Sequence, residues 1–129
     1  MDELERLKRV FYDYTTELQV CENITCNIRA EVIDRHELTV KIALECMVHY
    51  LKKNNIECKY PNCYRYIIRK AIEYELITNK NLWKQIGMDL DFEHTDEFEQ
   101  LCYFKKICEQ YVYVMDDFIK IMSEKINTF

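Results

Sequence analysis

The residue whose type most suggests acid–base chemistry is His94, which lies in a strongly acidic stretch. Histidine donates or accepts a proton near neutral pH, so His94 could act as a general acid or base. Chemistry on a phosphate would also need a fixed cation to hold the negative charge that develops. Residues 85–101 contain no lysine or arginine and six carboxylates: Asp89, Asp91, Glu93, Asp96, Glu97 and Glu99. The carboxylates would repel a phosphate, which argues against this chemistry at His94.

Cysteines suggest two other kinds of site, a disulfide framework and a metal centre. Seven are present: Cys21, Cys26, Cys46, Cys58, Cys63, Cys102 and Cys108. Their odd number, and a charged N-terminal run with no signal peptide, favour reduced thiols in a cytoplasmic protein. The pairs 21/26 and 58/63 have four intervening residues rather than the two of zinc knuckles. We therefore expect no metal and no cofactor. Glycine-rich phosphate loops, Gly-x-Ser-x-Gly and His-Glu-x-x-His do not occur either.

The elements that must position these residues are helices. Gly87 and Pro61 are the single glycine and the single proline of the chain, too few for the tight turns of a β-sheet protein. We expect one domain over residues 1–129, an all-α, antiparallel, up-and-down four-helix bundle with one short extra helix. No apolar run approaches the roughly 18 residues of a membrane span. The net charge of −5 provides no dominant positive field for sequence-independent binding of nucleic acid.

Apolar periodicity places the helices along the chain. The expected ranges are 2–21, 26 or 29 to 53, 61–76, 79–87, and from 95 onward. Asp2 is the expected N-cap of the first helix, and Pro61 is expected in the first turn of the third. Gly87 is expected to stop the short helix, and Thr95 to begin the last one.

The last helix is apolar around more than half of its circumference. Its central stripe is flanked on one side by Val112, Ile119 and Ile126 and on the other by Ile107, Val114 and Ile121. A bundle helix with a solvated face does not need so wide an apolar surface. We therefore predict a homodimer, with Val112, Ile119 and Ile126 as interface candidates. In the alternative, the short helix and the loops cover the extra surface.

Charge is distributed unevenly along the chain. Residues 52–84 contain eight basic and three acidic residues, whereas the charged residues of 85–101 are all acidic. Such a dipole indicates a partner surface or a self-complementary contact, and solvated helix faces are the alternative explanation.

Several short segments carry a resemblance to a known family. They are Asp34-Arg35-His36-Glu37-Leu38-Thr39, Arg69-Lys70-Ala71, Glu75-Leu76-Ile77 and Trp83. Over residues 28–122 the chain resembles the nucleotidyltransferase substrate-binding proteins of the HEPN superfamily. Members are dimeric four-helix bundles that accompany a minimal nucleotidyltransferase. The resemblance implies a non-catalytic substrate-binding subunit with that enzyme as its partner.

The chain departs from the ribonuclease members of this superfamily. Those members carry an Arg, four to six variable residues and a His at the start of the last helix, often with a Tyr two residues beyond. His94 occupies the His position, but residues 87–93 contain no Arg, and Asp96 replaces the Tyr. Arg29 and His36 match the spacing in the wrong helix, which we interpret as chance. We therefore expect no enzyme; the alternative is a ribonuclease toxin neutralised by its nucleotidyltransferase antitoxin.

The resemblance provides five candidates for binding a substrate, a nucleotide or RNA: Arg35, Glu37, Arg69, Trp83 and His94. Arg35 either lines a polar pocket with Glu37 or pairs with Glu31 on the surface. Arg69 either holds a phosphate or pairs with Glu73 one turn later.

The remaining two candidates have structural alternatives that we favour. Trp83 could stack on a base, but a lone Trp after a loop more often closes a core. His94 is interpreted as a helix-start residue beside acidic neighbours rather than as a relic of a catalytic histidine.

Overall fold

The computed structural model describes residues 3–20 and 25–127, and within those ranges the chain is all-helical, without strands. The helices are α1 (Glu3–Val20), α2 (Cys26–Lys53), α3 (Tyr64–Glu73), α4 (Lys80–Asp91), α5 (Glu97–Lys106), a π-helical segment η1 (Ile107–Tyr111) and α6 (Val112–Asn127). Because α5, η1 and α6 follow one another without a break, they form one long helix. The all-α fold class predicted from the sequence is confirmed.

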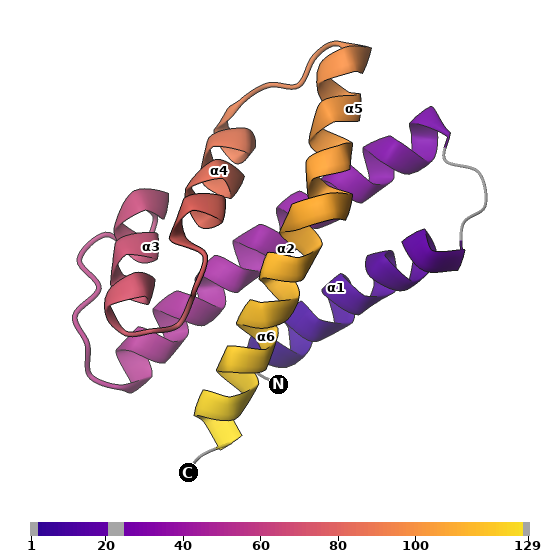
Figure 1. Cartoon of the computed structure of the whole chain (residues 1–129). Coiled ribbons are helices and arrows are strands. Elements are labelled where there is room, and N and C mark those ends of the chain that lie inside the picture. Colours follow the sequence, from indigo (N-terminus) through magenta and orange to yellow (C-terminus); the bar gives the residue numbers. More distant parts are fainter. Residues whose placement is uncertain (1–2, 21–24, 128–129) are drawn as a thin grey trace.

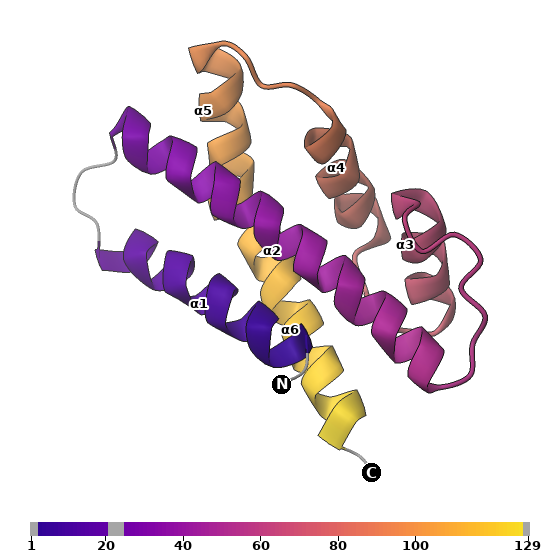
Figure 2. The same cartoon turned by 180° about the vertical axis from the view of Figure 1, so that it is seen from behind.

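The helices α1 and α2 lie side by side along their length, and the long helix crosses them (Figure 1). Figure 2 shows α3 and α4 as a second, shorter pair, with α3 beside the C-terminal part of α2. Thr25 caps α2, since its hydroxyl accepts a hydrogen bond from the Ile28 amide at 3.3 Å. The predicted N-cap Asp2 and the predicted helix end Cys21 lie outside the described residues.

The long helix begins one residue later than predicted. Its N-cap is Asp96 rather than Thr95, and the Asp96 carboxylate accepts a hydrogen bond from the Glu99 amide at 2.7 Å. Asp96 and Glu99 have the spacing of a capping box, and Glu97 and Glu99 place negative charge at the positive helix end.

Two predicted roles in the short helices are wrong. Pro61 lies in a turn before α3, which begins at Tyr64 with Cys63 as its N-cap. Gly87 does not stop α4, which continues to Asp91. A Cβ at Gly87 would overlap the ring of Tyr64. The glycine is therefore needed for the close approach of α3 and α4 rather than for a helix end.

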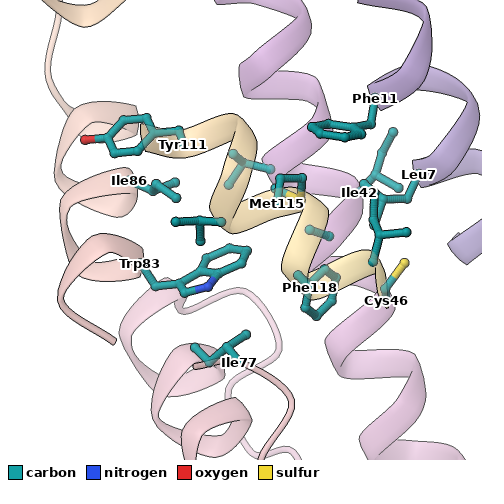
Figure 3. Close-up of a cluster of buried hydrophobic side chains, with 14 of the residues drawn as sticks. Leu7, Phe11, Ile42, Cys46, Ile77, Trp83, Ile86, Tyr111, Met115 and Phe118 are labelled. Atoms are coloured by element: carbon teal, nitrogen blue, oxygen red, sulfur yellow. The ribbon is translucent and has the colours of Figure 1, made fainter. Parts of the chain in front are cut away.

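The core lies where α4, α2, α1 and the long helix meet, as Figure 3 shows for part of it. Trp83 is 1% exposed and packs edge-on against Phe118, with ring centroids 5.7 Å apart. The interpretation of Trp83 as a core anchor is confirmed, and the residue is not accessible for stacking on a base.

The apolar flanks of the long helix are largely covered by the chain itself. Ile119 is 2% exposed and belongs to the core, as do Ile107 and Val114 on the other flank. Ile119 is thus corrected from an interface candidate to a core residue. Val112 and Ile126 are half-buried and pack against the core. No helix among the described residues has the length and apolarity to cross a membrane.

Candidate functional site

His94 is built into the turn that precedes the long helix. Its ring stacks on Tyr103, with centroids 4.1 Å apart and planes at 24°. Its Nε2 lies 3.0 Å from the Asp89 carbonyl oxygen, so this nitrogen carries a hydrogen and donates it. The His94 carbonyl in turn accepts a hydrogen bond from the side-chain Nε2 of Gln100 at 3.2 Å. These contacts fix the turn between α4 and α5.

Tyr103 connects this turn to α2. Its side chain is buried, and its hydroxyl donates a hydrogen bond to Glu37 Oε2 at 3.1 Å. Burial raises the pKa of Tyr103 well above its usual range, and the Glu37 charge adds to the rise. The phenol therefore stays protonated and remains a donor to the carboxylate.

A second tyrosine–carboxylate pair lies beside the first. The Tyr111 hydroxyl donates to Asp89 Oδ2, and Lys106 Nζ lies 3.7 Å from the same oxygen. Burial and the bond to Asp89 raise the pKa of Tyr111. Tyr111 ends the π-helical segment, where the Val112 amide bonds to the Ile107 carbonyl five residues earlier. Such segments inside α-helices are frequently found at functional sites.

His36 lies between the two tyrosines and is 1% exposed. It stacks on Tyr111 at 5.5 Å and 18°, and meets the Tyr103 ring edge-on at 5.8 Å. Neither ring nitrogen has a hydrogen-bond partner among the described residues. Burial lowers the pKa of His36 to about 3, so the imidazole is neutral at pH 7. The sequence contained a signal for this position, since Val32, His36 and Val40 recur at four-residue intervals along one face of α2.

We call these residues the tyrosine cluster: His36, Glu37, Asp89, His94, Tyr103, Lys106 and Tyr111. Sequence reasoning selected only Glu37 and His94 from it, and the structure brings those two to the same tyrosine. Glu37 and Asp89 each accept a hydrogen bond from a tyrosine hydroxyl, and Lys106 is paired with Asp89. The cluster thus contains a histidine that could transfer a proton, but its lysine, Lys106, is already paired with a carboxylate.

Glu37 also lines an open groove of about 650 Å³ between α2, the turn before α3 and the end of α4. Apolar side chains contribute to the groove, among them Leu44, Val48 and Leu90. Charged and polar groups along it include Glu37, Lys41, Glu45, His49, Lys52 and Asp91. We call it the α2 groove. Its volume lies within the range of about 300–1,000 Å³ that is typical of small-molecule sites.

The other sequence candidates lie elsewhere. Arg35 pairs with Glu31 at 2.9 Å, as the surface alternative predicted. Arg69 is exposed on α3, and Glu73 pairs with Lys70 at 3.5 Å instead of with Arg69. The predicted Arg69–Glu73 pair is therefore wrong. Neither arginine lines the α2 groove.

A second open groove, of about 600 Å³, runs between α1 and the long helix. It is lined by Val112 together with the aromatic residues Phe11, Tyr12, Phe104 and Tyr113. Tyr113 is 66% exposed, so this α1 groove presents aromatic surface to solvent. Val112 is the interface candidate that lies in it.

Among the described residues, Cys58, Cys63, Cys102 and Cys108 carry free thiols, and Cys46 is buried in the core. Within the part of the chain that the structure describes, no group of three or more His, Cys, Asp or Glu side chains could hold a metal ion. Cys21 and the side chain of Cys26 lie outside that part.

Comparisons with models of known protein families, with curated proteins and with solved structures give no match.

Proposed function

We propose that this chain is a non-catalytic, substrate-binding subunit of a minimal nucleotidyltransferase, of the HEPN type. In this proposal the helices act as an up-and-down four-helix bundle that pairs into a homodimer. The observation that carries the proposal is the position of Glu37. It lines the α2 groove and is fixed by Tyr103, on which His94 stacks. The segment 34–39, which carries part of the family resemblance, thus contributes Glu37 to the wall of a groove with the volume of a small-molecule site.

The geometry around His94 supports a binding role over a catalytic one. Its Nε2 donates to a backbone carbonyl, and its ring is held by stacking. Lys106 neutralises Asp89 rather than facing an open site. Phosphate transfer needs a cation where the negative charge develops, and the cluster commits its lysine to a carboxylate.

Co-purification tests the proposal. A small nucleotidyltransferase encoded beside this gene should form a stable complex on co-expression, and separate elution of the two proteins would contradict the proposal. The complex should bind a ribonucleoside triphosphate. Lys41→Glu, in the α2 groove, should weaken that binding at least about tenfold, because a hydrogen bond to a charged group contributes about 1.5–3 kcal/mol. Lys120→Glu, at an exposed position of α6, is the matched control and should leave the affinity unchanged.

A ribonuclease toxin is the second candidate, and one observation favours it. Lys106 is 46% exposed and reaches Asp89, whose carbonyl contacts His94. A cation missed by the sequence pattern therefore lies in the same cluster as the histidine. If the purified chain cleaves RNA and His94→Ala and Lys106→Ala abolish cleavage, the non-catalytic proposal fails. A silent parent that gains activity in Met88→Arg, at an exposed position, would identify a degenerate member kept for binding.

The proposed homodimer is tested by sedimentation. We assign its interface to the α1 groove, because Val112 and the exposed Tyr113 and Tyr12 lie there together. The chain should sediment as a dimer at micromolar concentration, and Val112→Glu should shift it toward monomer while Lys84→Glu, at an exposed position of α4 outside the groove, should not. A monomeric parent chain would refute the dimer.

A further inference from the structure

The outer face of α3 carries two rows of side chains that suit one kind of ligand. Tyr66, Lys70 and Tyr74 follow one another at four-residue intervals, and so do Arg65 and Arg69 in the neighbouring row. Residues four apart lie above one another on a helix. An aromatic row and a cationic row therefore run in parallel along α3, up to its C-cap Tyr74. The exposed carboxylate of Glu73 lies one residue before Tyr74 and pairs with Lys70 at 3.5 Å.

The aromatic row is organised by contacts among its members. Lys70 Nζ lies 5.9 Å from the centroid of the Tyr66 ring and 6.0 Å from that of Tyr74. Tyr60, from the preceding loop, meets Tyr66 edge-on at 5.1 Å. The Tyr66 hydroxyl accepts a hydrogen bond from the Lys59 amide at 3.0 Å, which ties this loop to α3. Three tyrosine rings are thus held in one surface with a lysine between two of them.

This surface remains accessible to a ligand. Tyr60 is 58% exposed and Tyr74 is 37% exposed, although burial of such rings is favourable. Arg65 and Arg69 are exposed as well. We call this set the α3 face: Lys59, Tyr60, Arg65, Tyr66, Arg69, Lys70 and Tyr74.

The basic and acidic residues of this part of the chain are separated, and the basic ones gather in the segment that contains α3. Residues 52–84, which include the α3 face, hold eight of the 18 lysines and arginines of the chain. The six carboxylates of residues 85–101 extend from the second half of α4 to the start of α5. Figure 1 shows that the connection between α4 and α5 lies at the far end of α4 from α3. The net charge of −5 is therefore compatible with a locally positive α3 face.

We propose that the α3 face binds single-stranded nucleic acid, with Arg65 and Arg69 on phosphates and Tyr60 and Tyr74 stacked on bases. Proteins that bind single strands combine cations along the backbone with aromatic platforms for the bases. An acidic protein would also be attracted by the arginines. It would not require exposed, ordered aromatic rings interleaved with the cations, which is why the observations favour a nucleic acid. This inference concerns a surface separate from the α2 groove and does not depend on a nucleotidyltransferase partner.

Fluorescence anisotropy with a fluorescein-labelled oligouridylate of about 12 nucleotides tests the proposal, since single-strand sites span about 4–16 nucleotides. The full chain should bind at about 50 mM salt and lose affinity steeply toward about 200 mM. Arg65→Ala/Arg69→Ala should lower the slope of log affinity against log salt by about 1.4, the value for two phosphate contacts on a single strand. Lys105→Ala/Lys120→Ala removes two exposed cations of the long helix and should leave both affinity and slope unchanged.

Stacking is tested separately from charge. Tyr60→Ala and Tyr74→Ala should each weaken binding at least about fivefold without changing the salt slope. Tyr60 is the safer position for folding, because it lies in a loop and is the most exposed of the three rings. Circular dichroism of each variant should remain that of the parent chain.

Four results would overturn the proposal. The parent chain could fail to bind at low salt, or the control pair could weaken binding as much as the arginine pair. A loss confined to the arginine variants, with no effect of either tyrosine, would indicate a surface for acidic proteins instead. Equal competition by double-stranded RNA would likewise exclude a site that stacks on bases.

Discussion

Replacing His36 by phenylalanine should stabilise the protein at neutral pH and make it less sensitive to mild acid. The imidazole is 1% exposed, stacked on Tyr111, and without a hydrogen-bond partner for either nitrogen among the described residues. A phenyl ring can keep the stacking while removing one buried donor and one buried acceptor. Since a buried unsatisfied group costs about 1–3 kcal/mol, His36→Phe should raise the free energy of unfolding at pH 7 by about 1–2 kcal/mol.

The pH dependence has a definite sign and size. His36 has a pKa of about 3 in the fold against 6.5 in an exposed chain. Below pH 6.5 the unfolded chain binds a proton that the folded chain excludes. Stability linked to His36 is therefore complete above pH 6.5, decreases as the pH falls toward 3, and is constant below that. Between pH 7 and pH 4.5 the loss amounts to about 2–3 kcal/mol.

Urea unfolding followed by circular dichroism at pH 7 and pH 4.5 measures this loss. The carboxylates titrate in both proteins, so the difference between the parent chain and His36→Phe isolates the histidine. His49→Gln is the control, because His49 lies at an exposed position on the same helix, and it should keep the acid sensitivity of the parent. Equal losses in the parent and in His36→Phe would refute the neutral, buried state of His36.

Three further predictions concern the packing that positions the tyrosine cluster, each measured by urea unfolding. Gly87→Ala should destabilise the protein by about 1–2 kcal/mol, since the overlap with the Tyr64 ring outweighs the gain in helix propensity, and the same change in a Tyr64→Leu background should cost less. Asp89→Ala should cost about 2 kcal/mol by leaving the Tyr111 hydroxyl without its acceptor, whereas Asp89→Asn should cost less. Ile119→Ala should cost about 2–5 kcal/mol because Ile119 is in the core, and Val112→Ala should cost clearly less because Val112 is half-buried; similar costs at the two positions would contradict the burial.

The sequence was sufficient for the helices and for the fold class. Scarcity of glycine and proline excluded sheets, and three-and-four periodicity located every helix to within a few residues. For Arg35 the sequence left two alternatives open, and the structure shows the i, i+4 pair with Glu31. Trp83 was correctly interpreted as core from its type alone.

The sequence misassigned residues whose roles depend on contacts between helices. Gly87 leaves room for the ring of Tyr64, which lies 23 residues earlier in the chain. No local sequence pattern indicates this contact. Ile119 was assigned to an interface because periodicity measures how wide an apolar surface is, not which helices cover it. In the structure α1 packs on α6 and α4 on the π segment, which covers much of that surface.

The candidate site was decided by the tertiary structure. The family resemblance gave Glu37 and His94 as separate candidates on different segments, and only the packing of the long helix against α2 brings both to Tyr103. Lys106 and His36 joined the cluster for the same reason, because the environment of a side chain is set by neighbours that are distant in sequence. The sequence by itself determined which residues could do chemistry and the helices that carry them. The tertiary structure decided which of them meet, which are buried, and which charges are already paired.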